Sequence, residues 1–260
     1  MKAMESIGRN SVRGIDGIGF GTTLMAESLY WLVAGRWNRQ PVRLDPIMAQ
    51  AVEVGLRAVP IATLLSATIG FMLAIQSLYS LGLFGAESYA FVGIALSVTR
   101  EFSPLIIGIL VAGRSGSALA ARLATMTINQ EVDALRVIGV SPVRYLLSPM
   151  VISMIILLPM LTAWSCVVAL LAAALFVSSA MDTTMLAFLS DVMSILSVGD
   201  ILHGLGKSAV FALLIVAVGA VNGAMVSGGA DGVGRQTTRA VVHGISAIVI
   251  ADMLFAFLVI

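Results

Sequence analysis

Long apolar runs separated by short polar connections dominate the hydrophobic pattern of this chain. Five of these runs are near or above the roughly 20 residues that a helix needs to cross a bilayer. The runs are Val54–Leu78, Ser88–Gly113, Leu146–Val177, Ile201–Val226 and Ala240–Ile260. The pattern predicts an all-α integral membrane protein with five transmembrane helices.

One further segment has apolar residues at helical spacing but is too polar to be assigned as a sixth span. Residues Asp16–Ala34 include Asp16 and Glu27, and an aromatic cluster of Tyr30, Trp31 and Trp37 lies at its end beside Arg36 and Arg39. An aromatic and basic cluster at the end of such a segment is typical of a helix that lies in the membrane interface. We therefore expect an N-terminal interfacial amphipathic helix, with a spanning helix as the alternative.

Two short helices are expected in the connections. Thr127 and Gln130 have the spacing of a capping box, which would start a helix over Glu131–Ile138 that ends at Gly139. Val132, Leu135 and Ile138 would share one face of that helix. The segment Thr184–Leu196 has apolar residues three or four apart and predicts a short surface helix. The first helix either rests on the membrane as an ordinary loop helix or fits a cleft on a soluble partner.

Composition supports the membrane assignment and excludes several classes of function. Apolar residues make up 59% of the chain and charged residues only 11%, whereas soluble domains carry about 25%. The mean hydropathy is +1.02, so a soluble enzyme is excluded. A formal net charge of +1 argues against a nucleic-acid partner. Cys166, His203 and His243 have no ligand-spaced companions, so no metal site is predicted.

The distribution of basic residues predicts the orientation of the chain. Basic residues lie before the first run, between the second and third, and between the fourth and fifth. The other two connections, 80–87 and 178–200, contain acidic residues but no Lys or Arg. The positive-inside rule then places the N-terminus, residues 1–45 included, on the cytoplasmic side and the C-terminus outside.

Two basic residues lie inside the apolar runs, where a charge is costly. Arg100, with Glu101 beside it, is about 18 Å along the second run at 1.5 Å per residue. Lys207 is in the fourth run, and its side chain would reach Glu101 if the two helices were neighbours. One interpretation is an ion pair that only fixes helix packing; the other is a polar patch, joined by Gln76, in a cavity for an anionic or zwitterionic substrate.

Two apparent motifs do not fit their context. Gly206, Lys207 and Ser208 have the order of a nucleotide-binding loop, but they lie in a membrane run instead of a strand-to-helix turn. We therefore expect that no cofactor binds directly and that any ATP is used by a partner subunit. Gly113–Gly116 reads Gly-Arg-Ser-Gly, as in rhomboid proteases, with Ser115 as the nucleophile; its position at the basic end of a helix argues against an enzyme.

Five ordered segments of the chain together resemble the MlaE/YrbE family, the permease subunits of lipid-transporting ABC systems that work with MCE-domain proteins. The segments are SVTREFSP (97–104), VAGRSGSALA (111–120), NQEVDALRVIGVSPVRY (129–145), KSAVF (207–211) and GADGVGRQTTRAVV (229–242). The similarity runs from about residue 20 to the C-terminus and assigns 46–260 to the permease domain. It implies five spans, a homodimer, an ABC ATPase subunit and a periplasmic MCE-domain partner. Some relatives also work with or carry a STAS domain.

The resemblance also implies roles for particular residues. It places Arg100, Glu101 and Lys207 in a phospholipid cavity, and the acyl-contacting positions fall at Leu81 and Phe84. It makes the helix over 131–138 the ATPase-coupling helix, with contacts from Glu131, Asp133, Leu135, Arg136 and Ile138. In this chain Arg122 stands near that helix where relatives often carry Glu.

The function expected from this resemblance is movement of phospholipids between the bacterial inner membrane and the MCE partner, which maintains outer-membrane lipid asymmetry. The alternative is a proton-coupled secondary transporter or channel in which Glu101 titrates. Five spans without an internal repeat argue against an inverted-repeat transporter.

Overall fold

The computed structural model describes residues 17, 19–31, 44–181 and 183–258, and this part of the chain contains helices and turns without a β-strand. Five helical stretches are long and apolar enough to cross a membrane. They are Asp45–Gly82, Glu87–Ile128, Val143–Ala180, Val198–Ala224 and Gly229–Leu258. The all-α class and the five predicted spans are confirmed.

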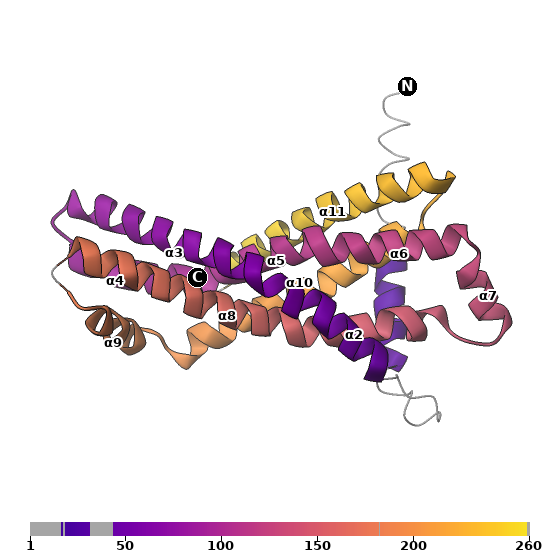
Figure 1. The fold of residues 1–260 in the computed structure, drawn as a ribbon, viewed down its shortest axis with the longest axis horizontal. Helices are drawn as coiled ribbons and strands as arrows, with labels where there is room; N and C mark the ends of the chain where they lie inside the picture. Colours follow the sequence, from indigo (N-terminus) through magenta and orange to yellow (C-terminus); the bar gives the residue numbers. More distant parts are fainter. Residues whose placement is uncertain (1–16, 18, 32–43, 182, 259–260) are drawn as a thin grey trace, which may run out of the picture. The chain divides into compact units, whose positions relative to one another are not determined.

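Each stretch is one helix or a series of consecutive helical segments (Figure 1). The first contains α2 (Leu44–Val54), η1 (Leu56–Ala58) and α3 (Val59–Gly82). The second contains η2 (Glu87–Tyr89), α4 (Ala90–Leu96), η3 (Ser97–Phe102), α5 (Ser103–Val111), η4 (Ala112–Gly116) and α6 (Ser117–Ile128). The third consists of η5 (Val143–Leu147) and α8 (Ser148–Ala180), the fourth is α10 (Val198–Ala224), and the fifth is α11 (Gly229–Leu258). The short helices α7 (Glu131–Val137) and α9 (Met185–Ile195) lie between them.

Several spans are longer than the apolar pattern indicates, and the largest differences are at one end of the second and of the fifth. The second continues past Gly113 to Ile128, and the fifth begins at Gly229, eleven residues before Ala240. Two further glycines, 232 and 234, follow Gly229. Gly229 has a positive φ of 68° at the start of α11, and the other two lie inside the helix.

The chain divides into two compact units. One combines the described residues of Ala51–Val111, Ile155–Ala212 and Ile248–Ile260. Within it, a stripe of small residues on α3 is buried: Ala62, Ser66, Gly70 and Ala74. A Cβ on Gly70 would overlap the backbone of Ala169 on α8. The small-residue stripe therefore lets the two helix backbones come into contact.

The same unit has a hydrophobic core that includes α9. Phe188 and Val192 of α9 are fully buried with residues of α3, α4 and α8. The Thr184 hydroxyl accepts a hydrogen bond from the Ala187 amide at 3.2 Å and caps the helix. The predicted short helix over 184–196 is confirmed.

The other unit combines the described residues of Met1–Gln50, Ala112–Met154 and Leu213–Ala247. Here a row of small residues on α6 meets glycines of α10. Ala120 and Ala124 are fully buried. A Cβ on Gly223 would lie 2.8 Å from the Ala120 carbonyl oxygen, and one on Gly219 3.0 Å from that of Gly116.

The helix α7 follows α6 after a tight connection (Figure 1) and begins at Glu131 as predicted, but the predicted capping box is wrong. Thr127 does not cap α7, because it lies in the last turn of α6 and donates to the Leu123 carbonyl at 2.8 Å. Gln130 precedes α7 instead, with a left-handed φ of 60°. The predicted end is confirmed, since Gly139 has a φ of 79° and its amide bonds the Arg136 carbonyl at 3.0 Å.

An N-terminal helix covers residues 19–31 and contacts the segment that follows α7. Glu27 accepts hydrogen bonds from Trp31 at 3.3 Å and from Ser141 at 3.1 Å. The Arg144 guanidinium lies 5.5 Å from the centre of the Trp31 ring, and Ser28 is 3.3 Å from Ser148. The interfacial position of this helix stays a prediction. The basic residues and Trp37 that follow Ala34 lie outside the described residues.

Candidate functional site: a charged cluster within the spans

The second span changes its helical winding where its charged residues occur. Arg100 and Glu101 lie in η3, a π-helical segment between α4 and α5. Such segments are rare and are found mostly as single-turn interruptions of α-helices, frequently at functional sites. The sequence does not predict this change of winding.

Lys207 of α10 is the centre of the cluster. Its side chain is fully buried, and its Nζ donates to Glu101 Oε2 at 2.5 Å and to the Arg100 carbonyl at 3.3 Å. Asp252 of α11 lies on the same ammonium, with 2.9 Å between Nζ and Oδ1. The contacts with Arg100 and Glu101 are hydrogen bonds, whereas the contact with Asp252 is an ion pair without hydrogen-bond geometry. A buried charge is otherwise costly, and this arrangement compensates it.

A glycine explains why α10 comes so close to η3. Gly204 lies three residues before Lys207 and therefore on the same side of the helix. A Cβ at this position would overlap the Thr99 carbonyl oxygen. The absence of a side chain allows the backbone contact that brings Lys207 within reach of the Arg100 carbonyl.

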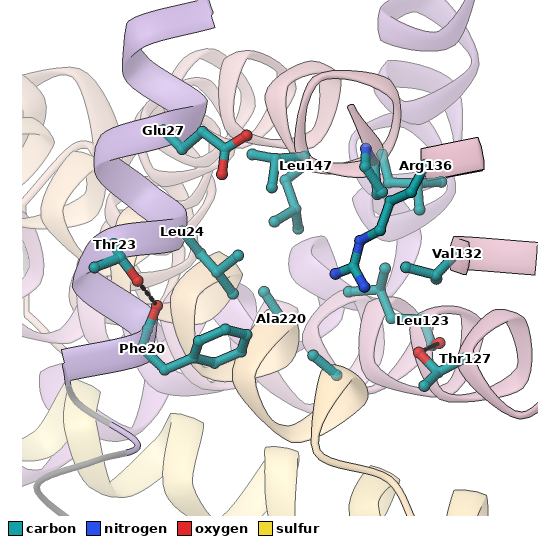
Figure 2. Close-up of a pocket in the computed structure, with 14 residues that line it drawn as sticks. Phe20, Thr23, Leu24, Glu27, Leu123, Thr127, Val132, Arg136, Leu147 and Ala220 are labelled. Atoms are coloured by element: carbon teal, nitrogen blue, oxygen red, sulfur yellow. Dashed lines mark hydrogen bonds between the residues drawn. The ribbon is translucent and has the colours of Figure 1, made fainter. Parts of the chain in front are cut away.

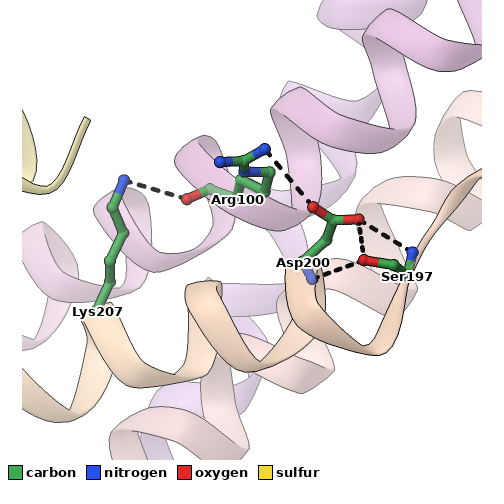
Figure 3. A network of polar contacts seen from close by, with 4 residues as sticks. All are labelled: Arg100, Ser197, Asp200 and Lys207. Atoms are coloured by element: carbon green, nitrogen blue, oxygen red, sulfur yellow. Dashed lines mark hydrogen bonds and ion pairs between the residues drawn. The ribbon is translucent and has the colours of Figure 1, made fainter. Parts of the chain in front are cut away.

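Arg100 is held by the first turn of α10 (Figure 3). Its Nη1 lies 3.6 Å from Asp200 Oδ1. Asp200 is fixed in turn by Ser197, whose amide and hydroxyl donate to Oδ2 at 3.0 and 2.7 Å, while the Asp200 amide donates to the Ser197 hydroxyl. This reciprocal pair caps α10. The Arg100 side chain keeps 31% of its surface exposed, so its guanidinium is anchored without being enclosed.

The charges of the cluster do not cancel. Arg100 and Lys207 face the carboxylates of Glu101, Asp200 and Asp252, which leaves one formal negative charge when all are ionised. Glu101 is 38% exposed and Asp252 16%. The cluster therefore has a sealed centre at Lys207 and a more accessible side formed by Arg100 and Glu101.

His203 and Asp252 are members of the cluster region that sequence reasoning missed. His203 lies between Asp200 and Lys207 on α10, and its Nε2 is buried without a hydrogen-bond partner among the described residues. Its ring packs edge-on against Phe255, with 6.1 Å between ring centroids. A lone Asp in the fifth apolar run was the available signal for Asp252, because an intramembrane carboxylate needs a partner.

The remaining predicted substrate contacts are not gathered at the cluster. Gln76 is exposed on α3. Leu81 packs against the core that contains Phe188. Phe84 lies in the turn after α3 and is one of the most exposed apolar side chains, at 82%. Their expected contact with acyl chains stays a prediction.

The predicted coupling residues lie together on α7. Glu131, Asp133, Arg136 and Ile138 are exposed, while Leu135 is partly buried. Arg136 pairs with Asp133 at 3.0 Å. The shared apolar face is only partly as expected, because Val132 and Leu135 turn inward whereas Ile138 points to the surface with 70% of its area exposed.

The described residues contain no group of three His, Cys, Asp or Glu side chains arranged to hold a metal ion. The charged cluster consists of ion pairs and hydrogen bonds.

Comparison with known proteins identifies the family. The family described as Permease MlaE matches residues 47–258. The chain belongs to the MlaE permease family. A probable ABC transporter permease of Rickettsia conorii is 31% identical over 250 residues, which cover 96% of this chain and 95% of the relative. A Synechocystis protein with the same description is 32% identical over 90% of this chain and 88% of its own length.

A plant relative is also similar. The Arabidopsis thaliana protein named trigalactosyldiacylglycerol 1, chloroplastic, is 34% identical over 80% of this chain and 60% of its own length. With the five spans, these relationships establish the chain as an MlaE-family permease subunit of an ABC transporter, a multi-pass membrane protein that works with an ATPase.

Proposed function

We propose that this MlaE-family permease moves phospholipids between the bacterial inner membrane and a periplasmic MCE-domain protein. The observation that carries the proposal is the charged cluster. Lys207 fixes the η3 backbone and Glu101, while Arg100 presents a partly exposed guanidinium within an apolar span. A guanidinium can bind a phosphate through two parallel hydrogen bonds.

The geometry supports different tasks for the two cations. Lys207 is enclosed and already has two carboxylates, so we assign it the positioning of η3. Arg100 has one counter-ion at 3.6 Å and an exposed side, so we assign it the contact with the head-group phosphate. A plant relative that is named after a diacylglycerol lipid is consistent with a lipid substrate.

The proposed assembly contains two copies of this permease, an ABC ATPase and the MCE-domain protein, with a STAS-domain protein as a possible addition from the family resemblance. In α11 only 11% of the most apolar window is buried, against 28–50% in the other spans, which leaves a long face for the second copy. ATP is hydrolysed by the ATPase, and this subunit transports without catalysis. We place its N-terminus in the cytoplasm and its C-terminus in the periplasm.

The extraction of a lipid from the bilayer explains why the permease works with an ATPase. Removing a lipid from the bilayer exposes its acyl chains at about 0.8 kcal/mol for each CH₂. A diacyl lipid therefore leaves the membrane only when the step is coupled to an energy source or when an apolar path replaces the bilayer.

The test is mass spectrometry of the lipids that co-purify with the intact complex, for the natural protein and for Arg100→Gln. We expect phospholipid in the natural complex and about tenfold less after the substitution, since a charge-assisted hydrogen bond contributes about 1.5–3 kcal/mol. Arg122→Gln, an exposed Arg on α6, is the matched control and should retain the lipid. Equal lipid content in all three would refute the assignment of Arg100.

The charge imbalance of the cluster supports one competing function, a proton-coupled transporter or channel that uses Glu101. The pH gradient separates the two. A lipid permease should transfer lipid between reconstituted vesicles with ATP whether or not a pH gradient is present, whereas a proton-coupled carrier should stop transporting when the gradient is collapsed.

A further inference from the structure

A cavity lies beneath α7, in the unit that contains this helix, and the proposed lipid transport does not use it. It has a volume of about 280 Å³. Its walls come from the helix 19–31, α6, α7, the start of the third span and α10 (Figure 2). The lining side chains that matter here are Leu24, Leu123, Leu147, Ala224, Glu27 and Arg136.

The interior of this cavity has few free polar groups that could hydrogen-bond a water molecule. The two hydroxyl groups in its lining donate to carbonyls of their own helices, Thr23 to Phe20 and Thr127 to Leu123, both at 2.8 Å. A buried water needs two to four polar partners. Apart from Glu27 and Arg136, the remaining walls are aliphatic or aromatic, so most of the interior suits an apolar occupant.

Charged groups lie at opposite sides of the cavity. Figure 2 shows the Arg136 guanidinium reaching from α7 toward its middle, with Glu27 across from it. Glu27 is already bonded by Trp31 and Ser141. Arg136 donates through Nη1 to Asp133 at 3.0 Å, and a guanidinium has five N–H donors. The donor capacity that remains is on the Arg136 side.

Size separates this occupant from the proposed transport substrate. A volume of about 280 Å³ lies at the lower end of the roughly 300–1,000 Å³ of small-molecule pockets. A single short hydrocarbon chain suits this volume, and the two long chains of a phospholipid do not.

We propose that this cavity binds a single-chain anionic amphiphile with a short hydrocarbon tail, its tail among Leu24, Leu123 and Leu147 and its anionic group on Arg136. Asp133 is an exposed partner that an anion can displace, because such surface pairs are weak. Val132 and Arg136 of α7 line the cavity, so an occupant is in direct contact with the helix that the family resemblance assigns to ATPase coupling.

The test is photolabelling of the complex with its ATPase in zwitterionic nanodiscs, using decanoate with a diazirine at the tail end. We expect labelled peptides from 19–31, α6 and 143–147, with labelling that saturates and that decanoate displaces. Decyltrimethylammonium, of the same tail and opposite charge, should displace at least tenfold more weakly. Labelling that neither compound displaces reports contact with bulk lipid and overturns the proposal. The absence of labelled cavity peptides overturns it too. That second result is also expected if an ATPase side chain fills the cavity.

Variants make the test specific. Ala224→Leu fills the cavity and should reduce saturable labelling about tenfold, whereas Ala118→Leu, at an exposed position of α6 outside the cavity, should not. Arg136→Gln should remove the preference for decanoate over decyltrimethylammonium, and Arg122→Gln should keep it. Unchanged labelling in Ala224→Leu, with the variant folded by gel filtration, contradicts the proposal.

Discussion

Lys207 shows how a single side chain organises several spans. It is fully buried, donates hydrogen bonds to the Arg100 carbonyl and to Glu101 of the second span, and forms an ion pair with Asp252 of the fifth. Isolated buried charges are costly, but a lysine that faces two carboxylates is compensated, and removing it leaves both carboxylates without their counter-ion.

Substitution of Lys207→Met should therefore lower the free energy of unfolding by about 3–5 kcal/mol. The measurement is denaturant or thermal unfolding of the purified protein in detergent. Asp133→Asn, which removes an exposed carboxylate of α7, is the control and should change stability by less than about 0.5 kcal/mol.

A second substitution distinguishes the origin of this loss. If unpaired carboxylates cause it, the double variant Lys207→Met with Asp252→Asn should be more stable than Lys207→Met alone. A double variant that is less stable than the single one contradicts the counter-ion explanation.

The sequence predicted part of this cluster. Arg100, Glu101 and Lys207 stood out because charges are rare in apolar runs, and the reach of lysine suggested the pair with Glu101 that the structure contains. The contact with Asp252 depends on which spans are neighbours, which residue spacing along one chain does not encode. The Asp200 pair with Arg100 was missed for the same reason.

At the scale of elements, close helix contacts depend on where a Cβ is absent. Gly204 lies against the Thr99 carbonyl, whereas Gly206, two residues later on the same helix, has open space around it. The two glycines therefore offer a matched comparison.

We expect Gly204→Ala to destabilise the protein by about 1–3 kcal/mol, because the added methyl group forces α10 away from η3. Gly206→Ala should be neutral or stabilising by up to about 1 kcal/mol, since alanine favours a helix. Thermal unfolding of both variants checks this, and equal effects would contradict the close contact at Gly204.

The connection between α6 and α7 gives another test. Gln130 has a φ of 60°, a conformation that costs an L-residue about 1–2 kcal/mol. Gln130→Gly should raise the free energy of unfolding by up to about 1 kcal/mol and Gln130→Val should lower it. A glycine variant less stable than the natural protein would contradict the left-handed conformation.

Elements were predictable where hydrophobic period and length coincide, and less so at their ends. The five spans and α9 follow from their apolar residues. The capping box at Thr127 was wrong because α6 continues through it, and its hydroxyl bonds a carbonyl of the preceding turn. The π-helical windings at η3, η4 and η5 have no sequence period of their own, so the apolar pattern does not reveal them.

At the scale of the whole molecule, family membership implies an ATPase, and α7 is the expected point of contact. Val137 and Ile138 are exposed by 87% and 70% at its end. Ile138→Asp should reduce the co-purifying ATPase at least tenfold, since loss of a central apolar contact costs about 2 kcal/mol or more. Leu186→Asp changes an equally exposed residue of α9 and should not. Retained ATPase in Ile138→Asp would exclude this residue from the contact.

The lysine on α10 also constrains how the polypeptide is made. A lysine at the centre of a helix opposes insertion by about 2.5–3.5 kcal/mol. Lys207 therefore makes the free energy of insertion of the fourth span less favourable when this span first enters the membrane from the ribosome. Glu101 has been synthesised by then, whereas Asp252 emerges last. Biogenesis therefore requires an early pairing with the second span and a final adjustment when the chain is complete, and a nascent protein truncated before Asp252 should be a preferred substrate of membrane quality-control proteases.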